Sequence, residues 1–395
     1  MKEKTTNSTK KIIIILLITL IGMAVSVLIW NISKQSFLFL KQDRYMDYFN
    51  TLKVSKNVYS DVGTGRGYFP FTYILLNIID FIIYDSYASY FITFIWVCIF
   101  LILFYSVFLK KWNLLGITLI TFLSYPLIFA FDRGNIEYLV LALLLLFFIF
   151  YKKEKYKTAA VLLAFPICMK LYPAVFILLF IKKKKLKEFF VCGIASILTM
   201  IASYCLLGGT LKSIPIAIDN FSYFTDVYAL TKNGVQFSHT VWSSMNYCNL
   251  LLSNTLINAD YITIYTISIA IISLFLTAYI IFIEKEEWKI ITILTVMMIT
   301  FPHVSFDYTL IHMYIPIVFF IMSKNTTKKE GILYSVLFGM TIIPMNWFQY
   351  IQNRTTLNLG LIVRPVILIT IIAIIVITGL KNKKTNIKTE LIEKR

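Results

Sequence analysis

The sequence predicts an all-α polytopic membrane protein, and three observations support this fold class. Residues of the set Ala, Val, Ile, Leu, Met, Phe, Trp, Tyr and Cys make up 58% of the 395 residues, and charged residues only 15%. The mean hydropathy is +0.77. A spanning helix needs about 20 apolar residues, and many such runs occur, with Lys and Arg concentrated in the gaps between them. We therefore expect one integral membrane domain over 1–395, without a separate soluble domain.

We expect about ten spanning helices, with a retained first helix because the run from Ile12 to Trp30 is too long for a signal peptide. The expected spans are 12–32, 87–109, 114–131, 136–151, 187–207, 260–283, 288–303, 308–323, 331–346 and 359–380. Seven segments on one side of these spans hold 26 of the 38 Lys and Arg residues. The positive-inside rule then places both termini, including the tail 381–395, in the cytoplasm. We expect the membrane to be the plasma membrane. The net charge of +18 reflects this topology, so no nucleic-acid partner is expected.

Two segments depart from a simple series of spans. Segment 158–181 is long enough to cross once but has basic loops at both ends, so we expect a re-entrant hairpin that turns near Pro166 and Pro173. Such irregular backbone persists at membrane depth only where protein or a cavity surrounds it. Segment 68–85 is a short apolar stretch that ends in Asp85, and we expect an interfacial helix there. The large extracytoplasmic loops are then 33–86 and 208–259.

The acidic residues divide by type between the two predicted faces. All nine acidic residues of the cytoplasmic segments are Glu, whereas all ten Asp residues and Glu137 lie in outer loops or at span ends. Within "QDRYMDYFN", Asp43 and Asp47 are four residues apart and would share one face of a helix. Either carboxylate, partly desolvated at the membrane surface, could act as a general base. The alternative is a solvated loop in which Arg44 and Lys41 pair with them.

The stretch "FDRGNIEYL", residues 131–139, places polar groups at a second outer corner. Arg133, Asn135 and Glu137 lie where one predicted span ends and the next begins, and Gly134 permits a tight turn. Four polar groups, with Asp132, exceed what a turn requires. The simpler interpretation is that Asp132 and Arg133 only cap and pair.

Three further groups are candidates for chemistry. Lys170, in "MKLYP", is 11 residues from either flanking loop, which is too far for its ammonium to reach water, so we expect it to hold a lipid phosphate. His303 and Asp307 are four residues apart at a helix break, although a lone His is often structural. Arg364 is another cation in an apolar span. No CxxC or HExxH-type spacing occurs, so neither a metal nor a disulfide is expected.

The order of these features resembles the GT-C glycosyltransferases, and within them glycosyltransferase family 87, whose members are polyprenol-phosphate-mannose-dependent mannosyltransferases. The resemblance covers about residues 10–325. Its elements are "DRYMDYFN", "YFPFTY", "RGNIEYLVLALLLL", "MKLYPAVFILLFIKKKK" and "HVSFDYTLIHMYIP". The family often has Tyr-Pro-Pro where this chain has Tyr68-Phe69-Pro70.

The resemblance implies an inverting transfer of a hexose, with mannose expected, from a polyprenyl-phosphate sugar to a glycan or glycolipid acceptor outside the cytoplasm. A first-loop Asp is the base in that family, which corresponds to Asp47, with Asp43 as the competitor. It implies no cofactor. The expected phosphate-binding residues are Lys170, Arg133, His303 and Arg364, and the expected sugar- or acceptor-binding residues are Asn135, Glu137, Tyr68 and Asp307. The alternatives are a polysaccharide polymerase or ligase and a lipid or glycan transporter, although no internal repeat is evident.

Overall fold

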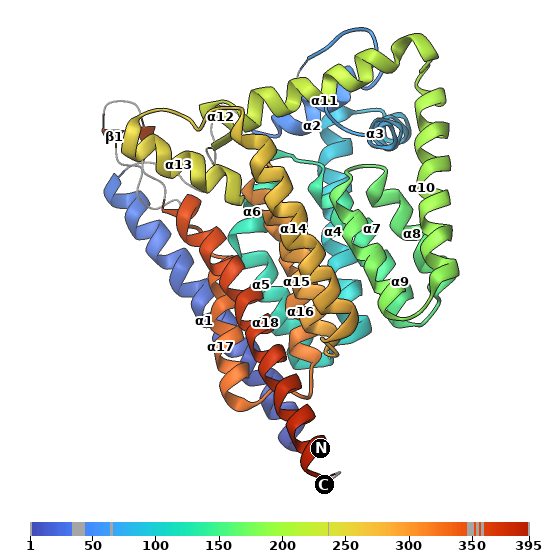
Figure 1. Ribbon diagram of the computed structural model, residues 1–395. Coiled ribbons are helices and arrows are strands. Elements are labelled where there is room, and N and C mark those ends of the chain that lie inside the picture. The colour runs from blue at the N-terminus through green and yellow to red at the C-terminus, as the bar shows by residue number, and fades with distance from the viewer. Residues whose placement is uncertain are drawn as a thin grey trace.

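The computed structural model describes residues 2–33, 44–63, 66–235, 237–345, 351–352, 355–356 and 359–393. These residues form helices, apart from loops and one pair of two-residue strands, β1 (Ile351–Gln352) and β2 (Thr355–Thr356). The all-α prediction is therefore confirmed at the level of class. The longer helices run along one direction as a bundle, and both termini lie at one end of it (Figure 1).

The helices of the first half follow the apolar runs closely. In chain order they are α1 (Lys2–Ser33), α2 (Met46–Val54), α3 (Pro70–Ile83), α4 (Ser86–Phe108), α5 (Lys111–Leu123), α6 (Tyr125–Arg133), α7 (Glu137–Lys152), α8 (Tyr156–Ile167), the 3-10 helix η1 (Tyr172–Ile177), α9 (Leu178–Lys182) and α10 (Leu186–Leu206). The predicted span 114–131 is divided into α5 and α6, which meet at an angle of 49°. Ser124 is extended at the break, and Pro126 stands in the first turn of α6, where a missing N–H costs nothing.

The second half of the chain is also mainly helical. Its elements are η2 (Leu211–Ser213), α11 (Ile214–Ala229), α12 (Lys232–Val235), α13 (Val241–Ser253), α14 (Tyr261–Phe282), α15 (Glu287–Thr300), η3 (Asp307–Met313), α16 (Tyr314–Met322), α17 (Lys328–Thr341) and α18 (Gly360–Glu393). The predicted span 308–323 is thus a 3-10 helix followed by a short α-helix. Every one of the ten predicted spans contains helical structure.

Five of the described helices are long and apolar enough to cross a membrane: α1, α4, α10, α14 and α18. The bent pair α5–α6 is a sixth candidate. The protein is therefore a multi-pass membrane protein, whereas the total of about ten crossings stays a prediction.

The core lies where helices are apolar on all sides. Every residue of α15 from Trp288 to Thr300 is buried, and so is α16 from Tyr314 to Ile321. By contrast, α10 and α14 expose apolar side chains such as Ile197 and Ile271. A helix that is apolar all round belongs in a core or a membrane, so α15 and α16 form the protein's interior and α10 and α14 its lipid-facing exterior.

The segment 158–181 folds as two short helical pieces with a turn between them. Helix α8 ends at Ile167, just after Pro166, and η1 begins at Tyr172. At the opposite end the two flanks meet, because Lys185 Nζ lies 5.1 Å from the centre of the Tyr156 ring. The chain therefore returns to the side from which it came, although its re-entrant position in a membrane stays a prediction.

The two large predicted outer loops gather at the end of the bundle opposite the termini (Figure 1). The first contains α2 and α3, and the second contains η2, α11, α12 and α13. Figure 1 looks down the axis of α3, which therefore lies across the direction of α4. This orientation is the one expected of an interfacial helix.

The contact between α1 and α5 allows a test of the packing. Gly116 on α5 faces Ile12 of α1, and a Cβ at Gly116 would lie 2.3 Å from Ile12 Cγ2. We predict that Gly116→Ala lowers the free energy of unfolding by about 1–3 kcal/mol through overpacking. The matched control is Gly193→Ala on α10, where a Cβ meets no described atom within 4 Å. Thermal unfolding of both variants in one detergent compares them, and equal stability would contradict the close contact.

Candidate functional site

Asp47 lies in the first turn of α2 and is bound by two residues from the turn between α6 and α7. Arg133 donates from Nη2 to Asp47 Oδ1 over 2.7 Å, and Asn135 donates from Nδ2 to Asp47 Oδ2 over 2.7 Å. The side chains of Asp47 and Arg133 are 19% and 20% exposed. Each carboxylate oxygen has two lone pairs, so this partly exposed carboxylate, with one donor on each oxygen, can still accept a proton.

The backbone explains why α2 lies against this turn. Tyr45, which precedes α2, has φ 59°, and its N–H donates to the carbonyl of Asp132 over 2.8 Å. Gly134 ends α6 with φ 64°, and a Cβ there would lie 2.7 Å from Tyr45 Cα. Only glycine satisfies both the left-handed conformation and this close approach. The Tyr45 ring then packs on Tyr90 of α4, with ring centres 4.9 Å apart.

Glu137, the first residue of α7, is the centre of a second group of polar side chains. Its carboxylate is fully buried and accepts from the Lys170 ammonium, from the Tyr172 hydroxyl and, over 2.9 Å, from Nε2 of His312. Its own backbone N–H donates to Asn135 Oδ1 over 3.2 Å. Asn135 therefore contacts both residues: its amide nitrogen donates to the Asp47 carboxylate, and its amide oxygen accepts from the Glu137 backbone N–H.

Lys170 lies in the turn between α8 and η1, surrounded by aromatic rings. Its Nζ is 5.0 Å from the ring centre of Tyr68, 5.6 Å from Tyr308 and 5.9 Å from Tyr172, and the side chain is 14% exposed. The first turn of α3 holds this turn, since Thr72 Oγ1 donates to the Met169 carbonyl over 3.2 Å. The rings partly replace water around the ammonium, while the exposed fraction leaves a side from which a ligand can approach.

Tyr68 is near both groups of polar side chains, the one around Asp47 and the one around Glu137. Burial raises the pKa of the Tyr68 hydroxyl well above its usual value, and the nearby Asp47 and Glu137 carboxylates raise it further. Burial also raises the pKa of Tyr228 on α11, with Asp47 adding to the effect and Arg133 opposing it. Both phenols are therefore neutral hydrogen-bond donors near Asp47. Asp47, Glu137 and Lys170 belong to one polar site at the end of the bundle where the two large loops meet.

Asp307 forms a separate, fully buried centre at the start of η3. Its Oδ1 pairs with Arg364 Nη1 over 2.5 Å and lies 3.2 Å from His239 Nδ1, and its Oδ2 accepts from the Tyr125 hydroxyl over 2.9 Å. Burial lowers the pKa of His239, although its hydrogen bond to Asp307 opposes this. His239 is thus neutral at pH 7, and Arg364, itself 1% exposed, supplies the countercharge.

His303 lies apart from these centres. Its Nε2 is 2.9 Å from Thr266 Oγ1 on α14, and its ring contacts those of Tyr265 and Trp242. No contact among the described residues connects it to Lys170. The geometry of the described site therefore does not test the prediction that His303 binds the donor phosphate.

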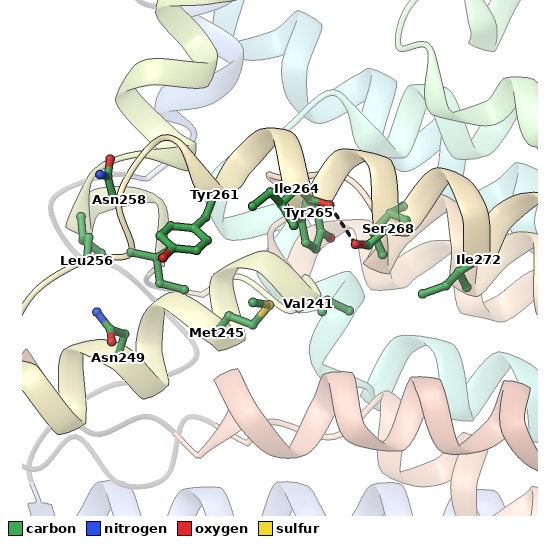
Figure 2. A pocket seen from close by; sticks show the side chains of 12 residues that line it. Val241, Met245, Asn249, Leu256, Asn258, Tyr261, Ile264, Tyr265, Ser268 and Ile272 are labelled. Atoms are coloured by element: carbon green, nitrogen blue, oxygen red, sulfur yellow. Dashed lines mark hydrogen bonds between the residues drawn. The ribbon is translucent and has the colours of Figure 1, made fainter.

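A groove of about 570 Å³ runs between α13 and α14, beside His303 (Figure 2). Ile264 and Ile272 line one part of it, and the neutral polar groups of Asn249, Asn258 and Tyr261 line another. None of its lining residues carries a charge. The groove suits an apolar chain, so we expect a phosphate to bind at Lys170 and not here.

Among the predicted site residues, the structure brings Asp47, Arg133, Asn135, Glu137, Lys170 and Tyr68 together, and it buries Asp307 and Arg364 against each other. Asp43 lies outside the described residues. The simpler alternatives paired Asp132 with Arg133, and Arg44 with the first-loop carboxylates. In the structure Arg133 binds Asp47, and Arg44 Nε lies 3.9 Å from Asp132.

Sequence reasoning missed five contributors: Tyr125, Tyr172, His239, Tyr308 and His312. Three of them had a signal. Tyr172 stands two residues after Lys170, and Tyr308 directly follows Asp307. For His312 the signal was its position within an apolar span, where an ionisable side chain requires a partner. Tyr125 and His239 had none.

No group of three or more His, Cys, Asp or Glu side chains suited to a metal occurs within the part of the chain that the structure describes.

The fold and the site together define a class: a multi-pass helical membrane protein with a partly exposed carboxylate and a nearby ammonium at one end of its bundle. The sequence model of Glycosyltransferase family 87 matches residues 67–304, which is more than half of the chain. The chain belongs to this family and is a membrane glycosyltransferase. A search of curated proteins gave no significant match, and neither did a search of solved structures.

The Asp307–Arg364 pair provides a stability test. We predict that Arg364→Met lowers the free energy of unfolding by about 3–5 kcal/mol, because it leaves a buried carboxylate without its countercharge. The double variant Arg364→Met/Asp307→Asn should recover part of this loss. Thermal unfolding measures both, and a double variant less stable than Arg364→Met alone would contradict the pairing.

Proposed function

We propose that this glycosyltransferase moves a hexose, with mannose as the expected sugar, from a polyprenyl-phosphate donor to a glycan or glycolipid acceptor. The observation that carries the proposal is the position of Asp47. It is partly exposed, oriented by Arg133 and Asn135, and shares the neighbour Tyr68 with Lys170. A base and a cation at one site match the two needs of glycosyl transfer, which are to take a proton from the acceptor and to stabilise the departing phosphate.

In the proposed reaction the acceptor hydroxyl oxygen attacks the anomeric carbon from the face opposite the phosphate. The bond from that carbon to the phosphate oxygen breaks, and the configuration is inverted. Asp47 accepts the hydroxyl proton. Arg133 and Asn135 hold both oxygens of Asp47, so the carboxylate meets the acceptor in a fixed orientation without reorganising during the reaction.

Lys170 stabilises the negative charge that develops on the departing polyprenyl phosphate. Glu137 positions the ammonium and offsets its charge in the resting site, and Tyr172 and His312 bind that carboxylate in turn. Arg133, 20% exposed, is the second cation near the phosphate. Asn135 and the neutral hydroxyl of Tyr68 are suited to hydrogen-bond the sugar.

We assign the site to the extracytoplasmic side of the plasma membrane, with both termini in the cytoplasm. Support comes from the charge distribution of the sequence and from the separation of the site from the termini along the bundle (Figure 1). Glycosyltransferase family membership supports an enzyme over a transporter.

Replacing Asp47 tests the base. We predict that Asp47→Asn lowers kcat/KM for transfer from a synthetic polyprenyl-phosphate mannose by about 10²–10⁴-fold. Asn keeps an acceptor oxygen for Arg133, so most of the fold contacts persist. Transfer is measured in purified, detergent-solubilised protein, together with thermal unfolding.

The matched control is Asp61→Asn, which changes an exposed first-loop Asp whose Oδ1 accepts from the Val62 N–H. It should keep wild-type transfer. Asp43→Asn is assayed in parallel because Asp43 is the competing base. Normal transfer by folded Asp47→Asn, with loss in Asp43→Asn, would reassign the base.

The Lys170–Glu137 pair separates catalysis from folding. We predict that Lys170→Gln lowers kcat by about 10²–10³-fold and also destabilises the protein, because buried Glu137 loses its countercharge. The double variant Lys170→Gln/Glu137→Gln removes both charges and should recover stability but not activity. Recovery of both would show that Lys170 only neutralises Glu137.

A further inference from the structure

A second pocket, of about 170 Å³, lies at the opposite end of the molecule from Asp47, between the start of α1 and the start of α17. These two helices pack side by side, and their described first residues lie near the end where the termini gather (Figure 1). Cationic side chains line part of the pocket, from Lys10, Lys11 and Lys328. None of the described residues that line it is acidic. The pocket therefore favours an anion.

The two exposed cations are the ones available to a ligand. Lys10 and Lys328 are exposed. Lys11 is buried, and its ammonium is already bound by the carbonyls of Phe320, over 2.8 Å, and Ser323, over 3.1 Å. The nearest acidic residue on α17, Glu330, accepts from the Thr327 N–H and pairs with Lys289 over 3.6 Å. Lys10 and Lys328 thus face the pocket without a carboxylate of their own.

The remaining wall of the pocket is apolar and continues onto a lipid-facing surface. Ile13 and Ile332 line it and are each 48% exposed. Along the same helix, Leu17 and Ile21 are also exposed, in the segment Asn7–Asn31 that is long and apolar enough to cross a membrane. A free anion such as phosphate would contact the lysines but not this apolar surface. A phospholipid can contact both, with its headgroup at the lysines and its acyl chains along α1.

We propose that this pocket binds a phospholipid with an anionic headgroup, taken from the membrane in which the protein lies. The headgroup phosphate lies between Lys10 and Lys328. The bound lipid joins α1 to α17. The site is remote from the proposed catalytic residues, so the proposal stands whether or not the proposed sugar donor is correct.

Native mass spectrometry of the full-length protein with added phosphatidylglycerol or phosphatidylcholine tests the proposal. Wild type should bind phosphatidylglycerol in preference to phosphatidylcholine. Each Lys near an anionic lipid contributes about 1 kcal/mol, so Lys10→Ala/Lys328→Ala should weaken phosphatidylglycerol binding by about 30-fold. Lys10→Arg/Lys328→Arg keeps the charge and should keep the binding.

The matched control is Lys153→Ala/Lys157→Ala, which removes two charges from exposed lysines, one just after α7 and one in the first turn of α8, and should leave the binding unchanged. Equal loss in this control would indicate a general charge effect and overturn the site. Equal binding of both lipids by wild type would overturn it as well. Displacement of phosphatidylglycerol by millimolar inorganic phosphate alone would identify a small-anion site and contradict the lipid assignment.

Discussion

The five-residue turn from Arg133 to Glu137 is the constraint on which the site depends. Arg133 and Asn135 bind Asp47, and Glu137 binds Lys170. Gly134 lets the backbone of Tyr45 approach, and this places α2 on the turn. One short segment therefore sets the relative position of the base and the cation. Because the turn is flanked by two apolar helices, α6 and α7, its geometry is fixed by the bundle.

Two buried carboxylates, Glu137 and Asp307, secure the surroundings of this turn. Removing a carboxylate from water costs several kcal/mol unless cations and donors replace the water. Each is satisfied by groups from distant segments, Glu137 by Lys170, Tyr172 and His312, and Asp307 by Arg364, His239 and Tyr125. The 3-10 helix η3 carries both Asp307 and His312. It thereby connects α18 to the turn and holds Tyr308 over Lys170.

Hydropathy predicted the helices well because burial in lipid or in a core requires apolar runs of a definite length. It did not predict the break at Ser124 or the 3-10 start of η3, since neither changes the apolar pattern. Position in the chain identified Asp47, Arg133, Glu137 and Lys170 as candidates. It could not pair them: Asp47 and Arg133 are 86 residues apart, and only the packing of α2 on the turn brings them together. Arg364 shows the same limit, because an ionisable group in a span requires a partner, but the sequence does not say that the partner is Asp307.

The most direct test of the account is a cryo-EM structure of the protein with a non-hydrolysable polyprenyl-phosphate sugar analogue and an acceptor. The account predicts the phosphate within hydrogen-bond distance of Lys170 Nζ, and the acceptor hydroxyl within hydrogen-bond distance of an Asp47 oxygen. A phosphate bound elsewhere, with Asp47 turned away from the acceptor, would contradict it.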